Sequence, residues 1–244
     1  MSVTDDLAQL ADEFWETVLE ISPLTGTQLG ERGHDANLPP LAPAELAGLR
    51  GRLEAQRSRL DALDPATLGE VDKVTRLALG SAIDAQITFL GADLPAWTVD
   101  PLSGPQIELL NVAEYQPAAT PEEAADLVAR WRAMGPWIET LTRRQRDSIA
   151  EGRLPVRALV RRVLDELDAL LARPDHEWPL LAPARAPHPD WSDGEQRAFA
   201  ADLASVVGDE IRPAFAAYRA FVADEALPAG RGDDAVGISA LPGG

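Results

Sequence analysis

The sequence predicts an all-α protein, a single helical domain of about seven or eight helices with two long irregular loops. Apolar residues recur at intervals of three and four along almost the whole chain of 244 residues, which is the period of an amphipathic helix. Apolar and polar residues alternate over no more than a few positions, so no strand is expected beyond a short hairpin. Residues that start helices, such as Thr, Ser and Pro, precede several periodic segments.

Four helical segments are expected in the first part of the chain. They fall at about residues 5–20, 23–29, 44–62 and 68–90, with a loop over 30–43. The first carries an apolar stripe, and the third is rich in Arg, Glu and Ala, which suits a surface helix. The side chains expected to face inward on the fourth are Val71, Val74, Leu77, Ala78, Ala82, Ala85 and Phe89.

Two irregular stretches, at residues 91–120 and 173–191, separate the remaining helices. Thr120 and Pro121 predict the start of the next helix, which Gly152 ends. The helix that follows, from Pro155 to about residue 171, has the broadest apolar face and is the expected core helix. Ser192 and Glu195 form a capping box that starts a long last helix, which Pro213 should bend.

The end of the chain differs in composition from the rest. Residues 228–244 are rich in Gly and Pro, and Gly243 and Gly244 close the sequence. Such residues shape tight backbone paths that a further element usually follows. We therefore predict a helical domain over residues 1–227 and a linking loop over 228–244, directed toward a C-terminal half that this sequence does not contain.

The amino-acid composition limits the kinds of partner and of chemistry that the chain can have. The formal net charge is −18, whereas a nucleic-acid surface needs clustered Lys and Arg, and an anionic membrane surface also selects basic proteins. The chain has no cysteine, which excludes disulfides, thiol nucleophiles and Cys-based zinc sites. No signal peptide and no apolar run long enough to span a bilayer are present, so the expected location is the cytoplasm.

Candidate catalytic groups are few. His34, His176 and His188 lie in predicted loops, and none has a second His one helical turn away, so no metal site is predicted. No serine sits in a Gly-x-Ser-x-Gly elbow, and no phosphate loop or dinucleotide fingerprint occurs. Three tryptophans in the irregular stretches either pin these segments to the body or line a cleft. They are Trp97, Trp178 and Trp191.

Several short motifs, taken in order, resemble the bacterial domain-of-unknown-function family 885. They are Phe14-Trp15-Glu16, Ser22-Pro23, Leu29-Gly30-Glu31-Arg32, Leu63-Asp64-Pro65, Gly104-Pro105-Gln106, Pro213-Ala214-Phe215 and the closing Ile238-Ser239-Ala240-Leu241-Pro242-Gly243-Gly244. The closing motif is the most specific. The resemblance spans nearly all of this chain but only about the first half of a typical member.

The resemblance implies a zinc metallopeptidase-like protein, mostly helical and in two parts around a deep cleft. A His-Glu followed shortly by Gly-His-His, in the second half, would bind the zinc and supply the general base. None of these residues occurs here, so the resemblance implies no catalytic residue and no cofactor in this chain. Its expected partners are its own C-terminal half and a peptide substrate.

Two hypotheses follow. In the first, the chain is one wall of the cleft of a hydrolase and is not catalytic alone. Glycine chemistry would then let an extended peptide approach the terminal segment, with candidate substrate-binding residues Ser239, Leu241, Gly243 and Gly244. In the second, the chain is a free-standing helical binding module without enzymatic activity. The coding sequence beyond Gly244 discriminates between them.

Overall fold

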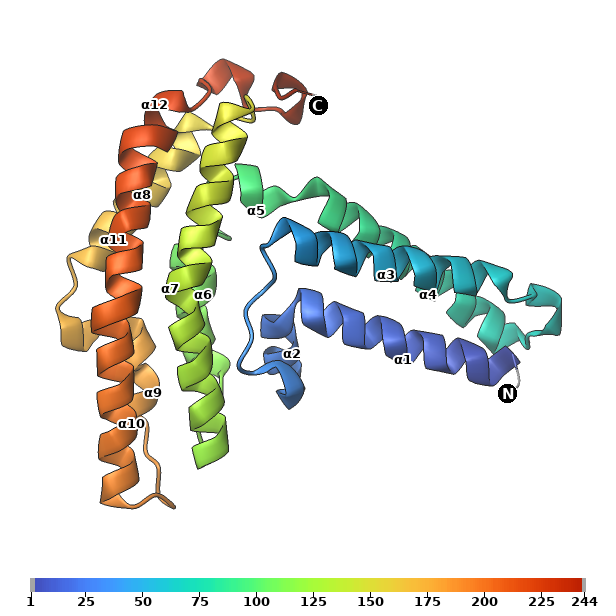
Figure 1. Ribbon diagram of the computed structural model, residues 1–244, viewed down its shortest axis with the longest axis horizontal. Coiled ribbons are helices and arrows are strands. Elements are labelled where there is room, and N and C mark those ends of the chain that lie inside the picture. The colour runs from blue at the N-terminus through green and yellow to red at the C-terminus, as the bar shows by residue number, and fades with distance from the viewer. Residues whose placement is uncertain (1–2, 243–244) are drawn as a thin grey trace. The chain divides into compact units, whose positions relative to one another are not determined.

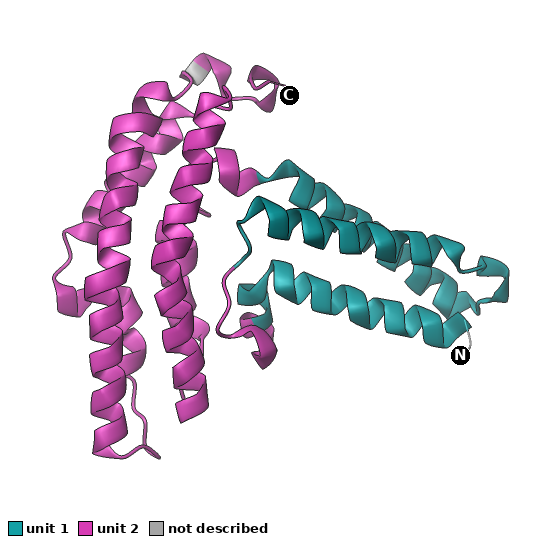
Figure 2. Cartoon of the chain, in the orientation of Figure 1, with its two compact units in different colours: residues 1–26, 39–93 teal, residues 27–38, 94–244 magenta. Residues whose placement is uncertain are grey.

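The computed structural model describes residues 3–242, apart from the side chain of Asp233, and is helical over most of that range (Figure 1). No strand forms within it. An isolated parallel bridge joins Val156 and Arg231. The predicted all-α class is therefore confirmed. The chain divides into two compact units, which are coloured separately in Figure 2.

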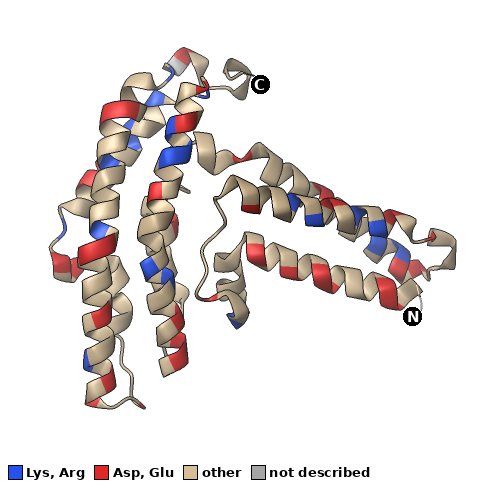
Figure 3. Cartoon of the chain, viewed as in Figure 1, with Lys and Arg blue, Asp and Glu red and all other residues tan. Residues whose placement is uncertain are grey.

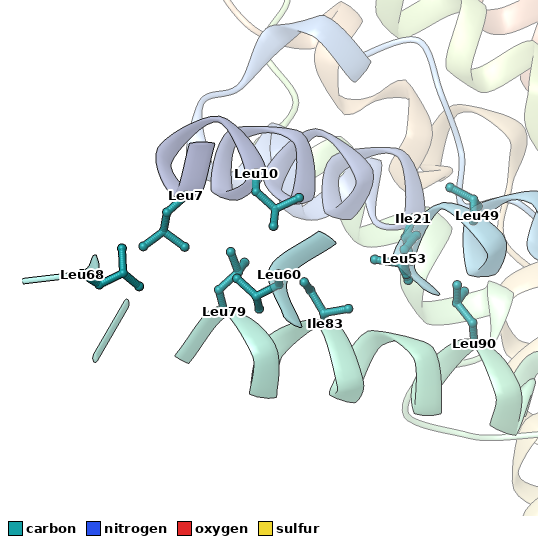
Figure 4. Packing of buried hydrophobic residues seen from close by; sticks show 10 residues of the cluster. All are labelled: Leu7, Leu10, Ile21, Leu49, Leu53, Leu60, Leu68, Leu79, Ile83 and Leu90. Carbon is teal, nitrogen blue, oxygen red and sulfur yellow. The ribbon is translucent and has the colours of Figure 1, made fainter. Parts of the chain in front are cut away.

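Unit 1 comprises residues 1–26 and 39–93. Its elements are α1 (Val3–Ile21), the start of α2 (Pro23–Leu29), α3 (Pro43–Ala62), a 3-10 turn η2 (Pro65–Thr67) and α4 (Glu70–Ala92). Helices α1, α3 and α4 pack on one another around a cluster made of leucine and isoleucine (Figure 4). The buried Gln56 of α3 adds a polar tie to α1, because its amide donates to the Glu13 carbonyl at 3.1 Å.

The inward face predicted for α4 is wrong. Val71, Val74 and Phe89 are 79%, 67% and 51% exposed, and Leu77, Ala78 and Ala85 are exposed as well. The residues of α4 that face the core are Leu79, Gly80, Ile83 and Leu90. The helix is apolar on two sides, so periodicity alone does not determine which side packs against α1 and α3.

Unit 2 comprises residues 27–38 and the chain from 94 onward. Its α-helices are α5 (Leu94–Trp97), α6 (Pro105–Tyr115), α7 (Pro121–Ala150), α8 (Arg157–Leu171), α9 (Ala182–Arg185), α10 (Asp193–Ser205), α11 (Arg212–Phe221) and α12 (Leu227–Ala229). The turns are η1 (Arg32–His34), η3 (Asp175–Glu177), η4 (Pro179–Leu181), π-helical η5 (Val206–Ile211) and η6 (Val222–Ala226), η7 (Asp233–Ala235) and η8 (Ile238–Ala240).

The predicted helix starts in unit 2 are mostly confirmed. Thr120 caps α7, with Pro121 in the first turn and Glu123 completing a capping box, and Ser192 caps α10 in the same way. Helix α8 buries Val160, Val163, Leu167 and Leu170 as the expected core helix. It begins at Arg157 rather than at Pro155, because Val156 is extended and pairs with Arg231. The π-helical turn η5 immediately precedes the turn of α11 that contains Pro213.

Candidate functional site

The terminal segment, residues 230–242, is anchored by the backbone and side chain of Arg231. The Arg231 amide donates to the Pro155 carbonyl at 2.9 Å, and the Arg157 amide donates to the Arg231 carbonyl at 3.0 Å. The Arg231 guanidinium donates to the carbonyls of Leu154 at 3.0 Å and Gly237 at 2.6 Å. A Cβ on Gly230 would stand 3.0 Å from the Arg157 Cα, which is tighter than an ordinary contact, so a larger residue would require the two segments to move slightly apart.

The predicted substrate-binding residues lie beyond this anchor. Ser239 is exposed in η8, and Leu241 is half-buried directly after it, with its amide donating to the Ile238 carbonyl at 2.9 Å. Ile238 is 69% exposed. Gly243 and Gly244 lie outside the described residues. The structure thus brings Ser239 and Leu241 together in one short turn whose route is set by Arg231.

A second polar centre, which the sequence did not predict, surrounds the buried guanidinium of Arg130 on α7. Its Nε donates to the Asn37 carbonyl at 2.8 Å, and one terminal nitrogen donates to Gln116 Oε1 at 2.5 Å. The other terminal nitrogen donates to the His34 carbonyl at 2.7 Å and to Thr27 Oγ1 at 3.0 Å. All of these partners belong to unit 2. The guanidinium of Arg130 therefore connects residues 27–37 to α7 by hydrogen bonds.

A buried carboxylate completes the Arg130 centre. Asp35 Oδ1 lies 3.9 Å from the guanidinium and accepts the Thr27 hydroxyl at 2.5 Å, while the Gln116 amide donates to the Asp35 carbonyl at 2.8 Å. Burial lowers the pKa of Arg130 to about 10, and the Asp35 charge opposes that shift. Arg130 therefore remains protonated at neutral pH, and its charge is balanced inside the unit.

One signal in the sequence could have revealed this centre. Arg130 lies three residues after Leu127 and four before Met134, which places a charge on the apolar stripe of the helix. A charged residue is almost never fully buried unless it is paired, so a charge on that stripe predicts a buried partner. The partner, Asp35, is 95 positions away and carries no local signal of its own.

Three tryptophans and one histidine of unit 2 are buried and act as packing groups, whereas the His176 side chain is 81% exposed. Trp131 donates its indole N–H to the Leu180 carbonyl at 3.0 Å, and Trp191 donates to the Ala119 carbonyl at 2.8 Å. The buried His188 stacks on Trp191 with ring centroids 4.3 Å apart. Trp178 is fully buried against Phe215. For Trp178 and Trp191, pinning of the irregular stretch is the role that the structure supports.

The ionisable groups whose pKa is displaced are held as stable ions or buried phenols. Arginine partners lower the pKa of Glu13, Asp168 and Glu225, and the Ser192 cap lowers that of Glu195. Burial raises the pKa of Tyr218, whose hydroxyl lies 3.3 Å from Gln145 Oε1. A general acid needs a raised carboxyl pKa, which these carboxylates lack. Acidic side chains are spread over helices of both units (Figure 3).

Across residues 3–242 no group of three or more His, Cys, Asp or Glu side chains is placed to hold a metal ion. Nor does any helix of the described range have the length and apolar character needed to cross a membrane. The residues present do not fit a zinc site.

Together these features define a helical protein of two compact units with one buried, charge-balanced centre. The chain belongs to the family described as "Bacterial protein of unknown function (DUF885)", whose model matches residues 23–244. The predicted resemblance to this family is thereby confirmed. No curated protein matches the chain.

The fold is shared with a solved structure. The chain is similar to the crystal structure of a protein from Colwellia psychrerythraea that is provisionally described as a lipoprotein, with a TM-score of 0.83 and 17% sequence identity. The likeness covers 99% of this chain and 44% of that one. At this level of identity it shows the fold alone. The chain thus spans less than half the length of a protein that contains the same fold.

Proposed function

We propose that the chain is the helical N-terminal portion of a zinc metallopeptidase-like hydrolase, in which it forms one wall of the cleft and is not catalytic alone. The observation that carries this proposal is the fold likeness, which covers 99% of this chain but 44% of the longer protein. A chain of this fold therefore occurs joined to a further part of comparable length. Membership of the family supports the same division, because the resemblance noted in the sequence implies a zinc-binding element in a second half.

Zinc belongs, in this proposal, to the second half. The described residues do not fit a metal site, so we assign them no step of a metal-dependent reaction. Their role is to shape and hold a surface. The Arg130 centre keeps residues 27–37 in place, and Arg231 sets the path of the terminal segment. The cytoplasm remains the proposed location, and a peptide the proposed substrate.

The terminal segment is the proposed contact with substrate. Ser239 is exposed beside Leu241, and the family match extends through Gly243 and Gly244. A glycine backbone lets an extended peptide approach closely, which a β-branched side chain would prevent. In the longer protein, Gly243→Val should therefore lower kcat/KM for peptide hydrolysis while leaving the melting temperature nearly unchanged.

A matched control is Gly208→Val, since no atom lies within 4 Å of where its Cβ would stand. Full catalytic efficiency of the Gly243→Val protein would show that the segment is only a linker. Replacement of the His-Glu pair expected downstream should abolish hydrolysis in the longer protein. Hydrolysis that survives this replacement would contradict the assignment of catalysis to the second half.

The alternative function is a free-standing helical binding module without enzymatic activity. The exposed apolar side chains on α4 favour it, because contiguous exposed apolar surface often marks an interaction site. The coding sequence after Gly244 separates the two proposals. An open frame that encodes the His-Glu element supports the hydrolase, and a natural stop codon supports the module.

A further inference from the structure

Two long helical segments of unit 2 are interrupted at the same level. Helix α7 contains Pro136 in its interior, directly after Gly135. The π-helical turn η5 connects α10 to α11, and Pro213 follows shortly after it ends. Helix α7 and η5 pack on each other (Figure 1). A Cβ on Gly135 would stand 3.5 Å from the Glu210 carbonyl oxygen in η5, so the two interruptions meet directly.

Both interruptions remove backbone hydrogen bonds that keep a helix straight. Pro136 has no amide hydrogen, so it cannot donate to the Arg132 carbonyl one turn earlier. In η5 the Arg212 amide donates to the Val207 carbonyl, which is five residues back rather than four. Pro213 likewise offers no hydrogen to the turn before it. Bending at this level therefore breaks fewer hydrogen bonds than bending within the uninterrupted turns of either helix.

The side chains at this level do not lock the two helices together. On α7 the contact with the Glu210 carbonyl is made by Gly135, which is buried and has no side chain. The buried side chains of η5 are apolar, and apolar contact is non-directional. They are Val206, Val207 and Ile211. A change in the angle between the helices thus breaks no hydrogen bond of these side chains.

Directional contacts of α7 lie on both sides of this level and hold different parts of unit 2. Before it, the Arg130 guanidinium donates to the carbonyls of residues 34 and 37 and so holds residues 27–37. After it, Gln145 donates to the Thr98 carbonyl at 2.7 Å, and Arg146 donates to a carboxylate of η6 at 2.6 Å. Each part of α7 is therefore joined to its own set of neighbours.

We propose that unit 2 contains a hinge at this level, formed by Gly135 and Pro136 of α7 together with η5 and Pro213. The two parts of the unit rotate relative to each other about it. One part contains residues 121–134 of α7 and α10, and the other contains residues 137–150 of α7 and α11. Prolines and π-helical turns are the usual places where helices bend, and a hinge needs only a few such residues.

The hinge lies between two segments that carry exposed residues. Residues 27–37 are joined to the first part through Arg130, whereas Arg231 joins the terminal segment to residues 154–157, directly after α7. Rotation at the hinge changes the separation of these segments. In the proposed hydrolase, on which this point rests, that rotation would open or close the wall of the cleft around the substrate. The hinge itself is a property of the chain alone and can be tested without hydrolysis.

Amide hydrogen exchange of the full 244-residue chain tests the hinge first. Peptides over residues 133–140 and 206–214 should exchange faster than the peptides that flank them, because local opening is easiest there. Pro136→Ala restores a donor in α7 and should slow exchange over both ranges by about tenfold. Pro213→Ala supplies a donor beside η5 and should have the same effect. Slowing in both helices after a substitution in one of them is the mark of a shared hinge.

Two other prolines provide matched controls. Pro121 lies in the first turn of α7, where a proline removes no helical hydrogen bond, so Pro121→Ala should leave exchange at the hinge unchanged. Pro228 follows the second π-helical turn, η6, as Pro213 follows η5. Arg146 holds η6 to α7 away from the hinge, so Pro228→Ala should also leave exchange there unchanged. Circular dichroism confirms that each variant is folded.

Distances between spin labels measure the bending itself, and labelling is specific because the chain has no cysteine. Ala129→Cys and Asp147→Cys replace exposed residues of α7 on opposite sides of Pro136. Val71→Cys and Phe89→Cys replace exposed residues of α4, which contains no proline. Both pairs span about 27 Å of helix at 1.5 Å per residue. The α7 pair should give the broader distance distribution, and Pro136→Ala should narrow it to the width of the α4 pair.

Three results would overturn the proposal. One is a wild-type α7 pair whose distance distribution is no broader than that of the α4 pair. Another is exchange over residues 133–140 and 206–214 that is as slow as in their flanks. The third is a Pro136→Ala variant that slows exchange in α7 but not in η5, because the two interruptions would then be independent.

Discussion

The two compact units bury their interiors with different chemistry. The core cluster of unit 1 consists of leucine and isoleucine from α1, α3, α4 and the residue after η2. Unit 2 buries Trp131, Trp178, Tyr218 and the charged Arg130, each at 1% exposure or less. In unit 1 the helices are held mainly by apolar contact, which is non-directional, and the buried Gln56 adds one polar tie. In unit 2 a directional network selects one position for residues 27–37, because each hydrogen bond of Arg130 requires its own acceptor.

This difference predicts which kind of substitution destabilises each unit. Apolar packing is weakened gradually by loss of volume, whereas a buried ionic network fails when one member is removed and leaves the others unpaired. Unit 1 should therefore respond to the size of a side chain, and unit 2 to the loss of one hydrogen-bonding group. The following variants test that contrast.

The largest effect is expected in unit 2 from Arg130→Ala. Its removal leaves Asp35 buried without its cation and leaves the carbonyls of His34 and Asn37 without a donor. The free energy of unfolding should fall by about 3–5 kcal/mol, the usual cost of breaking a buried charged network. Denaturant unfolding followed by circular dichroism measures it. Arg132→Ala, at an exposed position two residues away, should change it by less than about 0.5 kcal/mol.

In unit 1, Leu53→Ala should lower the free energy of unfolding by about 2–5 kcal/mol, because Leu53 is fully buried and its removal leaves a cavity. Leu53→Met keeps the volume and should cost less than about 1.5 kcal/mol. Urea titration of both variants gives the comparison. Equal losses for the two substitutions would show that unit 1 is not governed by packing volume.

A smaller effect is expected at the start of α10. Ser192 accepts from the Glu195 amide at 3.3 Å, and Glu195 accepts from the Ser192 amide at 2.8 Å. Ser192→Ala should lower the free energy of unfolding by about 1 kcal/mol. Ser192→Asp keeps an oxygen cap and should restore most of the loss. A melting temperature unchanged by the alanine variant would contradict the role of this cap.

The smallest effect concerns exposed ion pairs, the feature that both units share. Asp168 accepts from Arg219 at 2.7 Å, and this hydrogen bond lowers the pKa of Asp168. A lowered carboxyl pKa stabilises the fold above the unfolded-state pKa of about 4, and that contribution is lost as pH falls through the lower folded-state pKa. Asp168→Asn should cost at most about 0.5 kcal/mol at pH 7. Unfolding measured near pH 2 should show no difference from the wild type.

Sequence patterns predicted the helices better than the faces they bury. The capping residues Thr120 and Ser192 act locally, so the starts of α7 and α10 were predicted correctly. The packed face of α4 was not, because Val71 and Val74 on one side and Leu79 and Ile83 on the other are all apolar. Which side is buried depends on how α4 packs against α1 and α3, and the residue pattern of α4 alone does not specify that packing.

The polar contacts of the Arg130 centre and of the terminal segment could not be predicted from the sequence either. The pairing of Arg130 with Asp35 joins residues that only the tertiary fold brings together, and no local pattern marks Asp35 as buried. The terminal segment was predicted from composition alone, which did not indicate that Arg231 would anchor it on Leu154 and Pro155. Ser239, Leu241, Gly243 and Gly244 remain predicted substrate contacts.

Peptide hydrolysis by the purified 244-residue chain, measured with and without a chelator, tests the proposed division of labour most directly. A catalytic zinc needs about three protein ligands and an open position, and the described residues offer no such group. We predict no turnover above the buffer control, both before and after addition of zinc. Turnover that a chelator abolishes and zinc restores would contradict the assignment of this chain to a non-catalytic wall.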